Sequence, residues 1–338
     1  MGEKLTALIK QMNKQHKFTI ISEGLPEENV DRIPFSSPRL NYMLYGGIPQ
    51  GRIIEFFGSE GGGKTSSALD IVKNAQKIFP DKKVLYIDCE RTLDTVWATL
   101  LGVNISELIL VRPETETAEQ IFEIALQFMD SGEISLCVLD SLGVMVSAQA
   151  YEKTMEEKTY GGISQALTLF SRKAIPICAR TKCTFIGINQ MRADMGSMYG
   201  GETTTGGKAW RHNCSIRLQF RKGDFIDEKG NSLTRGCENP AGNLVQCSLI
   251  KSKVCRSDRR TGFYTLKYLE GIDYISDTID VALKLEYINQ GGAWYSIIDK
   301  ETGEILEKFQ GKDRLKQYYL AHPDKFEELT EKISKESF

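Results

Sequence analysis

The chain contains 338 residues, and its 43 lysines and arginines nearly balance its 45 aspartates and glutamates, so the formal net charge is −2. This balance excludes a surface coated uniformly in positive charge for nucleic acid, but it leaves a local basic groove open. The sequence has no signal peptide and no run of the roughly 20 apolar residues that cross a membrane. We therefore expect a soluble, cytoplasmic protein of about two domains.

Eight cysteines are scattered along the chain without a Cys-x-x-Cys pair, and only three histidines accompany them. Several of these cysteines lie in apolar, strand-like runs, where a reduced thiol behaves as a small core residue. The sequence therefore favours neither a disulfide framework nor a zinc site. The cysteines are Cys89, Cys137, Cys178, Cys183, Cys214, Cys237, Cys247 and Cys255.

The first predicted element is a short amphipathic helix over Glu3–Lys14. Its apolar residues recur at i, i+3, i+4 and i+7, which places them in one stripe. A helix of this length needs a surface to pack on, either its own core or a neighbouring subunit. The stripe consists of Leu5, Leu8, Ile9 and Met12.

From about Asp31 short apolar strands alternate with longer helical stretches. This alternation predicts an α/β fold in which helices cover both faces of a largely parallel sheet. The strands are expected at Ile53–Phe57, Val84–Asp88, Leu108–Val111, Leu136–Asp140 and Cys183–Ile188. Helices are expected from the Gly-rich loop to Lys73, and over Leu93–Leu101, Ala118–Asp130 and Ser164–Arg180.

The pattern changes after Asn213, where the helices give way to three strands that we expect to be antiparallel. These strands are Ser215–Phe220, Leu244–Ile250 and Phe263–Tyr268, with a turn-rich excursion between Gly223 and Gly242. From about Gly271 the chain becomes helical and charge-balanced again, which indicates a small α+β C-terminal domain. The expected divisions are residues 1–30, 31–269 and 270–338.

A Gly-rich loop between a strand and a helix matches the phosphate-binding pattern G-x-x-x-x-G-K-[ST]. Its glycines let backbone N–H groups surround phosphate oxygens, and the helix N-terminus adds partial positive charge. Lys64 is expected to reach the β- and γ-phosphates of ATP, and the Thr65 hydroxyl is expected to ligate Mg²⁺. The nucleotide-binding residues expected here are Gly58, Ser59, Glu60, Gly61, Gly62, Gly63, Lys64, Thr65 and Ser66.

Two acidic strand ends complete the expected ATP site. Asp140 follows four apolar residues at the carboxyl end of a strand, where it could hold Mg²⁺ together with Thr65. The strand that ends at Asp88 places Glu90 near the same edge, and we choose Glu90 as the base that activates water. Asp88 is expected to be structural, although the residues alone leave the choice between these carboxylates open.

Four further segments resemble the bacterial RecA recombinase family, and their order and spacing agree with it. The segments are Tyr86–Asp94 (YIDCERTLD), Phe185–Arg192 (FIGINQMR), Gly201–Ala209 (GETTTGGKA) and Gly291–Ser296 (GGAWYS). The resemblance places the family's catalytic glutamate at Glu90 and its γ-phosphate-sensing glutamine at Gln190, at the end of a strand. The third segment is similar to the end of the family's second DNA-binding loop, and the fourth to a C-terminal-domain signature.

The resemblance implies a helical filament on single-stranded DNA, with ATP clamped between neighbouring protomers. Asp94 and Trp97 would frame the adenine, and Trp97 stands where the family usually has a tyrosine. Lys251 and Lys253 would reach the γ-phosphate bound by the adjacent protomer. Without the resemblance we would interpret these lysines as a pair on an exposed edge strand. The N-terminal helix, within residues 1–30, would dock on the next subunit.

DNA would be held by two loops, at about Tyr151–Gly162 and Met191–Gly207. The second loop offers glycine N–H groups, hydroxyls, positive charge and an apolar residue that could wedge between bases. The alternative is a mobile surface loop, because glycine, serine and threonine are frequent in such loops. The expected DNA-binding residues are Thr168, Arg172, Arg192, Met195, Thr203, Thr205, Gly206, Gly207 and Lys208.

The implied function is a DNA-dependent ATPase that promotes homologous pairing and strand exchange in recombination, repair and the SOS response. Two alternatives remain open: a ring helicase or repair motor with the same core, and a nucleotide-gated scaffold that coats DNA. Asp194, Gln165 and the run Trp210-Arg211-His212 depart from the usual bacterial pattern. These departures, and the lack of a strongly acidic tail, suggest a divergent phage or mobile-element member.

Overall fold

The computed structural model describes residues 3–14, 21, 30–152, 162–193, 202–234 and 236–337. It divides into two compact units, Met1–Asp31 and Arg32–Phe338. In the first unit, helix α1 (Glu3–Lys14) confirms the predicted helix. Within it, Leu5, Leu8 and Met12 are 45%, 49% and 40% exposed, so the apolar stripe is open to a partner.

The second unit is built on a ten-stranded sheet with the order β12-β11-β10-β9-β3-β7-β6-β4-β5, and β8 pairs with β7. The strands from β9 to β5 are all parallel, which confirms the predicted α/β core. The strands are β3 (Ile53–Gly58), β4 (Lys83–Asp88), β5 (Leu108–Val111), β6 (Ile134–Asp140), β7 (Thr184–Ala193), β8 (Glu202–Thr204), β9 (Ile216–Ile226), β10 (Gly242–Ser252), β11 (Thr261–Lys267) and β12 (Gly271–Ile272).

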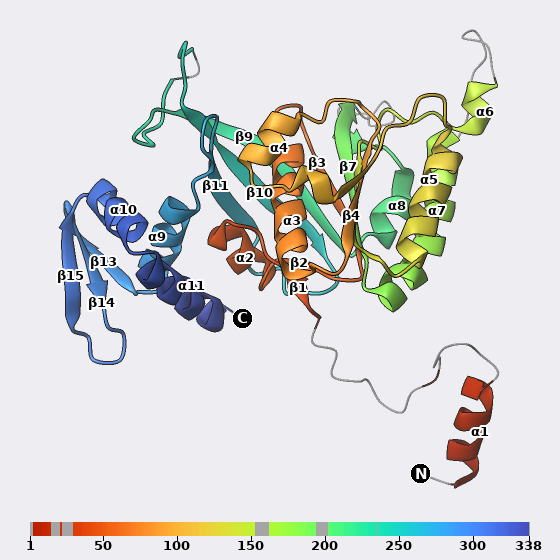
Figure 1. The fold of residues 1–338 in the computed structure, drawn as a ribbon, viewed down its shortest axis with the longest axis horizontal. Helices are drawn as coiled ribbons and strands as arrows, with labels where there is room; N and C mark the ends of the chain where they lie inside the picture. Colours follow the sequence, from red (N-terminus) through yellow and green to blue (C-terminus); the bar gives the residue numbers. More distant parts are fainter. Residues whose placement is uncertain are drawn as a thin grey trace. The chain divides into compact units, whose positions relative to one another are not determined.

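Helices cover both faces of this sheet, and α5 and α7 pack side by side against one of them (Figure 1). A small antiparallel pair, β1 (Arg32–Ile33) and β2 (Ile48–Pro49), precedes the sheet. The helices of the core are α2 (Pro38–Leu44), α3 (Lys64–Ile78), α4 (Thr95–Leu100), α5 (Ala118–Asp130), α6 (Ala148–Tyr151), α7 (Gly162–Thr181) and α8 (Gly207–Asn213), with a 3₁₀ turn at Ile105–Glu107.

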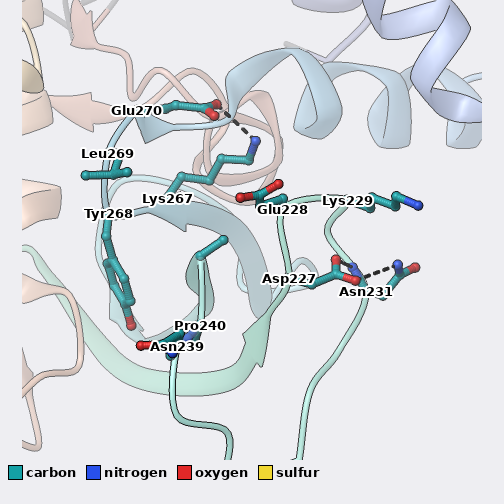
Figure 2. A pocket seen from close by; sticks show the side chains of 11 residues that line it. Asp227, Glu228, Lys229, Asn231, Asn239, Pro240, Lys267, Tyr268, Leu269 and Glu270 are labelled. Carbon is teal, nitrogen blue, oxygen red and sulfur yellow. Dashed lines mark hydrogen bonds and ion pairs between the residues drawn. The ribbon is translucent and has the colours of Figure 1, made fainter.

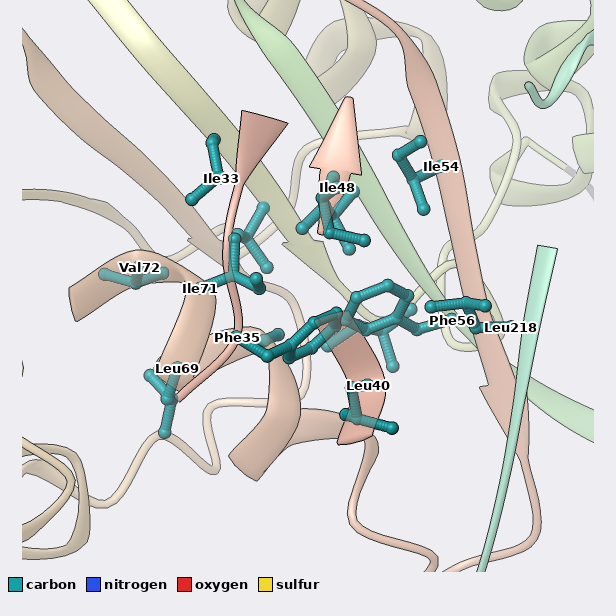
Figure 3. Close-up of a cluster of buried hydrophobic side chains, with 14 of the residues drawn as sticks. Ile33, Phe35, Leu40, Ile48, Ile54, Phe56, Leu69, Ile71, Val72 and Leu218 are labelled. Atoms are coloured by element: carbon teal, nitrogen blue, oxygen red, sulfur yellow. The ribbon is translucent and has the colours of Figure 1, made fainter. Parts of the chain in front are cut away.

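The strands bury both of their faces, because successive side chains point to opposite sides of a strand. Ile54 and Phe56 join a cluster with α2, α3 and α4 (Figure 3), whereas Ile53 joins a second cluster with α5, α7 and α8. Apolar side chains therefore pack against both faces of the sheet. This packing fixes the carboxyl ends of the parallel strands, where the ATP site was expected.

Two expectations about the strands are wrong. β9 is not purely antiparallel, since it pairs parallel with β3 on one side and antiparallel with β10 on the other. β7 does not end at Gln190 but continues to Ala193, because its last residues pair with β8. Gln190 therefore lies within a strand and not at its end.

Residues after β12 form a module with its own apolar cluster. Its helices and strands are α9 (Tyr274–Lys284), β13 (Ile288–Gly291), β14 (Trp294–Ile298), β15 (Ile305–Gln310), α10 (Lys312–Ala321) and α11 (Pro323–Ser337). The three strands form an antiparallel sheet, which confirms the expected small α+β domain. The module contacts the core through α9, which packs on α2 and β11, and through α11, which also contacts α2. Among the described residues, no helix combines the length and apolarity that crossing a membrane requires.

Candidate nucleotide and DNA site

The phosphate-binding loop follows β3 and leads into α3. A Cβ atom on Gly58 would lie 2.0 Å from the Phe220 carbonyl oxygen, so only glycine fits where the loop leaves the sheet. Gly63 precedes α3 with φ +89°, a left-handed conformation that also favours glycine. The loop therefore needs these two glycines for its path, independently of any ligand.

Lys64 is held at the centre of this loop. Its Nζ donates hydrogen bonds to the carbonyl oxygens of Gly58, at 3.1 Å, and Ser59, at 2.7 Å. The side chain is buried, and burial lowers the pKa of the ammonium although Asp140, Glu90 and Glu60 oppose the shift. The residues around Lys64 thus present a cation together with the N-terminus of α3, an arrangement that fits the phosphates of a nucleotide.

Thr65 and Asp140 lie together, as predicted for a magnesium site. Thr65 Oγ1 donates to Asp140 Oδ2 at 2.8 Å, and Tyr86 Oη donates to the same oxygen at 3.0 Å. Burial raises the pKa of Asp140, and these two hydrogen bonds oppose the rise. A hydroxyl and a carboxylate at this distance are the hard oxygen ligands that Mg²⁺ takes beside phosphates. The sequence analysis did not find Tyr86.

Glu90 and Gln190 are in direct contact. Gln190 Nε2 donates to Glu90 Oε1 at 2.9 Å, and Ser141 Oγ donates to the same oxygen. The neighbouring backbone ties β4 to β6, since Cys89 N donates to the Asp140 carbonyl oxygen at 2.7 Å. The proposed base, the proposed γ-phosphate sensor and the proposed metal ligand therefore share one edge of the sheet. The sequence analysis did not find Ser141.

Asp88 makes the contacts of a structural residue. Its oxygens accept from the backbone N–H groups of Thr92, at 3.1 Å, and Leu93, at 3.2 Å. Arg112 Nε adds an ion pair at 3.3 Å. These bonds fasten the segment that follows β4, so the carboxylate of Glu90 is the one left facing Gln190.

The residues expected to frame adenine lie at the start of α4. Asp94 caps this helix, accepting from Val96 N at 2.8 Å and Trp97 N at 3.0 Å. Trp97 Nε1 donates to Ser66 Oγ at 3.1 Å, which brings the half-buried indole beside the first turn of α3. Trp97, Asp94 and the phosphate-binding loop are thus brought together.

β10, which carries Lys251, is an interior strand between β9 and β11, and not the edge strand of the alternative interpretation. Its pairing with β11 ends at Ser248, however, and Lys251 pairs with Arg217 of β9. Lys251 Nζ donates to the carbonyl oxygens of Arg211, His212 and Cys214, at 2.7, 2.6 and 2.8 Å. The ammonium therefore caps the C-terminal end of α8. Lys253 follows β10, and its backbone N–H donates to the Ser215 carbonyl oxygen at 2.8 Å.

The expected DNA-binding residues are only partly brought together. Thr168 and Arg172 lie on α7, and the Thr168 hydroxyl donates to the Ser164 carbonyl oxygen at 2.7 Å while Arg172 is exposed. Residues 153–161 of the first loop, and Asp194 and Met195 of the second loop, lie outside the described residues.

The described parts of the second loop, residues 191–193 and 202–207, belong to the end of β7, to β8 and to the start of α8. Arg192, at the end of β7, donates to the Gly143 carbonyl oxygen and pairs with Thr203 of β8. Thr205 Oγ1 is buried without a hydrogen-bond partner among the described residues. Gly206 and Gly207, with φ +105° and +69°, lead into α8, on which Lys208 is exposed.

A separate polar pocket of about 1050 Å³ lies between the turn that follows β9 and residues 267–270 (Figure 2). Asp227 and Asn231 bond across that turn at 2.9 Å, and Lys267 pairs with Glu270 at 2.9 Å. No residue expected to bind nucleotide or DNA lines it. We assign this pocket no role.

The geometry of the site agrees with two family comparisons. A model of the RecA N-terminal domain matches residues 3–273, and a model of the RecA C-terminal domain matches residues 276–337. The chain belongs to the RecA family. Together the two models cover nearly the whole of this chain. The matched residues include the phosphate-binding loop, both described ends of the second loop and the module after β12.

Curated relatives extend the match over most of their own length. Protein RecA of Caldanaerobacter subterraneus subsp. tengcongensis is 35% identical over 340 residues, covering 98% of this chain and 94% of the relative. Protein RecA of Paracoccus denitrificans is 34% identical over 334 residues, covering 97% and 88%. Protein RecA of Ruminococcus albus is 35% identical over 311 residues, covering 91% and 73%.

Proposed function

We propose that this RecA-family protein is a DNA-dependent ATPase that forms helical filaments on single-stranded DNA and promotes homologous pairing and strand exchange. The observation that carries the proposal is the 2.9 Å hydrogen bond from Gln190 to Glu90, beside the joined Thr65 and Asp140. It links the group that would activate water to a strand that continues into the second DNA-binding loop. ATP and Mg²⁺ are the cofactors.

Each residue of the edge has a role in this proposal. Lys64 and the loop N–H groups would bind the phosphates, and Thr65 and Asp140 would hold Mg²⁺, which would neutralise the charge that develops on the phosphate oxygens. Glu90 orients the attacking water and takes its proton. Gln190 contacts the γ-phosphate, which competes with Glu90 for its amide. Asp94 and Trp97 bound the adenine.

The DNA-binding and filament roles are assigned by family position. Thr168, Arg172, the residues around Gly206 and Lys208 would contact the DNA backbone, which positions a strand without reading its sequence. Base pairing would then test homology during exchange. Lys251 and Lys253 would act on the nucleotide of the adjacent protomer, for which Lys251 must leave the end of α8.

Residues 1–30 would serve as the polymerisation segment, because the apolar stripe of α1 is exposed within its own unit. The ATPase core would span residues 31–269, and the C-terminal domain residues 270–338. Docking of α1 on a neighbouring core would bury the stripe and favour the filament.

The proposal is tested by ATP hydrolysis with and without single-stranded DNA at two salt concentrations. Lys64→Ala should reduce turnover at least about a hundredfold, because a preorganised cation at the phosphates is lost. Lys77→Ala, at an exposed position near the end of the same helix, is the matched control and should keep wild-type turnover.

DNA should stimulate hydrolysis, and added salt should weaken that stimulation, because phosphate contacts release counterions. Hydrolysis that is indifferent to DNA would contradict the DNA-dependent ATPase. Strand exchange is then measured as D-loop formation with homologous duplex. Stimulated hydrolysis without D-loops would favour a DNA-coating scaffold instead.

A further inference from the structure

A charged side chain lies in the middle of the strand that leads to the phosphate-binding loop. Glu55 of β3 stands between Ile54 and Phe56 and is completely buried. Both oxygens of its carboxylate nevertheless have partners. Oε1 accepts from Asn189 Nδ2 at 2.8 Å and from Trp210 Nε1 at 2.9 Å, and Oε2 forms an ion pair with Arg217 Nε.

These partners come from three different elements. Asn189 lies on β7, Trp210 on α8 and Arg217 on β9, so one carboxylate joins them all to β3. Trp210 is completely buried, and the Arg217 side chain is 12% exposed and stacks over the Phe57 ring at 4.5 Å. The network is therefore buried and closely packed.

On one side the network reaches the sheet edge where Thr65, Asp140, Glu90 and Gln190 lie, which we call the ATP edge. Asn189 Oδ1 accepts from the backbone N–H of Gln190 at 3.0 Å, and the Gln190 side chain donates to Glu90 at 2.9 Å. A displacement of the Gln190 backbone therefore moves the side-chain amide of Asn189, which is bound to Glu55.

On the other side the network reaches the stem of the second loop, residues 202–206. Asn189 Nδ2 donates to the Thr205 carbonyl oxygen at 2.8 Å. Arg217 Nη2 donates to Thr204 Oγ1 at 3.2 Å, and Thr204 is buried. Two of the three side chains that bind Glu55, those of Asn189 and Arg217, thus also bind the loop stem.

We propose that Glu55 is the positioning residue that couples Gln190 to the stem of the second loop. The inference rests on the proposed role of Gln190 in sensing nucleotide. A buried carboxylate that loses a partner is strongly penalised, so its three partners move with it and not independently. Glu55 therefore transmits a shift of Gln190 to Thr204 and Thr205. An apolar contact in its place would absorb the shift.

Glu55→Gln tests this, because it keeps the size of the side chain and removes the charge that holds Arg217. The matched control is Asp70→Asn on α3. Asp70 is also buried and accepts from Ser36 N at 2.7 Å and Lys73 Nζ at 2.8 Å, but none of its bonds among the described residues reaches the loop stem. Both variants exchange a buried carboxylate for its amide, so both should lower stability in urea.

The deciding measurement is hydrogen exchange of residues 202–213 with and without a non-hydrolysable ATP analogue, in the absence of DNA. In wild type and Asp70→Asn the analogue should slow exchange of this segment at least about tenfold. In Glu55→Gln the slowing should fall below about twofold, while the affinity for the analogue stays within about threefold of wild type.

Equal loss of slowing in Glu55→Gln and Asp70→Asn would assign Glu55 a purely structural role and overturn the proposal. Wild-type protein in which the analogue does not slow exchange of residues 202–213 would also overturn the proposal. If Glu55→Gln does not fold, Trp210→Phe removes one donor and keeps an aromatic ring in the core. It should lose part of the slowing, and full wild-type slowing in Trp210→Phe would overturn the proposal.

The outcome separates this inference from the proposed function. If DNA fails to stimulate hydrolysis but the analogue slows exchange only with Glu55 intact, the coupling stands and the recombinase function fails. If DNA stimulates hydrolysis equally in wild type and Glu55→Gln, the function stands and the coupling fails.

Discussion

Buried carboxylates at two places in the molecule differ in their hydrogen bonding. At the ATP edge, Asp88 and Asp140 are both buried, and each accepts at least two hydrogen bonds. At the seam between α2 and α9, Asp277 is equally buried, but neither of its oxygens has a hydrogen-bond partner among the described residues. The cation nearest to it in the described chain, Arg39 Nη1, is 3.9 Å away and lies closer to Asp280, at 3.3 Å.

The difference shows where this fold needs exact geometry. Hydrogen bonds at the ATP edge hold carboxylates in fixed orientations, which the proposed ATP hydrolysis would require. At the seam only packing between two modules is needed, and an unmet carboxylate is tolerated at a cost in stability. Burial raises the pKa of Asp277 well above its ordinary range, and Arg39 and the nearby Ser37 hydroxyl oppose the rise only in part.

The largest expected effect is at the ATP edge. Glu90→Gln keeps a side chain of the same size for Gln190 and Ser141, but an amide cannot take a proton from water. DNA-stimulated hydrolysis should fall about 10²- to 10⁴-fold, with ATP binding preserved. Turnover and nucleotide affinity are measured separately. Glu133→Gln, at an exposed turn, is the control, and wild-type turnover in Glu90→Gln would remove Glu90 from the mechanism.

The seam should respond in the other direction, by gaining stability. A carboxyl whose folded-state pKa is raised contributes stability that is present below its unfolded-state pKa, about 3.9, and is lost as pH rises through the folded-state pKa. Asp277→Asn stays neutral and escapes that loss. At pH 8 its unfolding free energy should exceed that of wild type by about 1 kcal/mol or more.

Urea unfolding of Asp277→Asn and wild type at several pH values between about 4 and 8 checks this, and the excess should shrink as pH falls. Asp280→Asn is the contrasting variant. Asp280 is paired with Lys312 at 2.6 Å and with Arg39, so removing its charge should lower stability. A destabilised Asp277→Asn at pH 8 would mean that the carboxylate has a compensating partner.

The smallest effect is expected on the outer helix of the C-terminal module. Lys332 and Glu328 of α11 form an i, i+4 pair at 2.8 Å, and both side chains are about half exposed. Lys332→Ala should cost less than about 0.5 kcal/mol, because water and salt screen an exposed pair. Urea unfolding at low and high salt measures it. A larger, salt-insensitive loss would show that this surface resembles the ATP edge more than it resembles ordinary helix surface.

Much of the fold could be predicted because its signals are local. The phosphate-binding loop, the strand Leu108–Val111 and the helix Ala118–Asp130 follow from short apolar runs, glycines and helical periodicity, and the structure gives the last two the same bounds. The meeting of Thr65, Asp140 and Glu90 could also be predicted, since parallel strands end at one edge of a sheet.

The remainder depends on pairings that a sequence pattern does not contain. Nothing local indicates that β9 joins β3 in parallel, or that Lys251 reaches the end of α8. Glu55 could have been noticed, because a charge inside the apolar run Ile53–Phe57 must find partners. Those partners lie 134, 155 and 162 residues away, however, so the sequence could raise the question without naming them.

The number of cysteines that a thiol reagent modifies distinguishes the folded chain from the unfolded chain. Cys137, Cys178, Cys183, Cys214 and Cys247 are buried, whereas Cys89, Cys237 and Cys255 are partly accessible. Burial and neighbouring carboxylates raise the pKa of Cys89 to about 12, so little reactive thiolate forms there at neutral pH. A thiol reagent therefore modifies few positions in the native chain and all eight after unfolding. Mass spectrometry of the alkylated chain would therefore separate folded from unfolded molecules by the number of added groups.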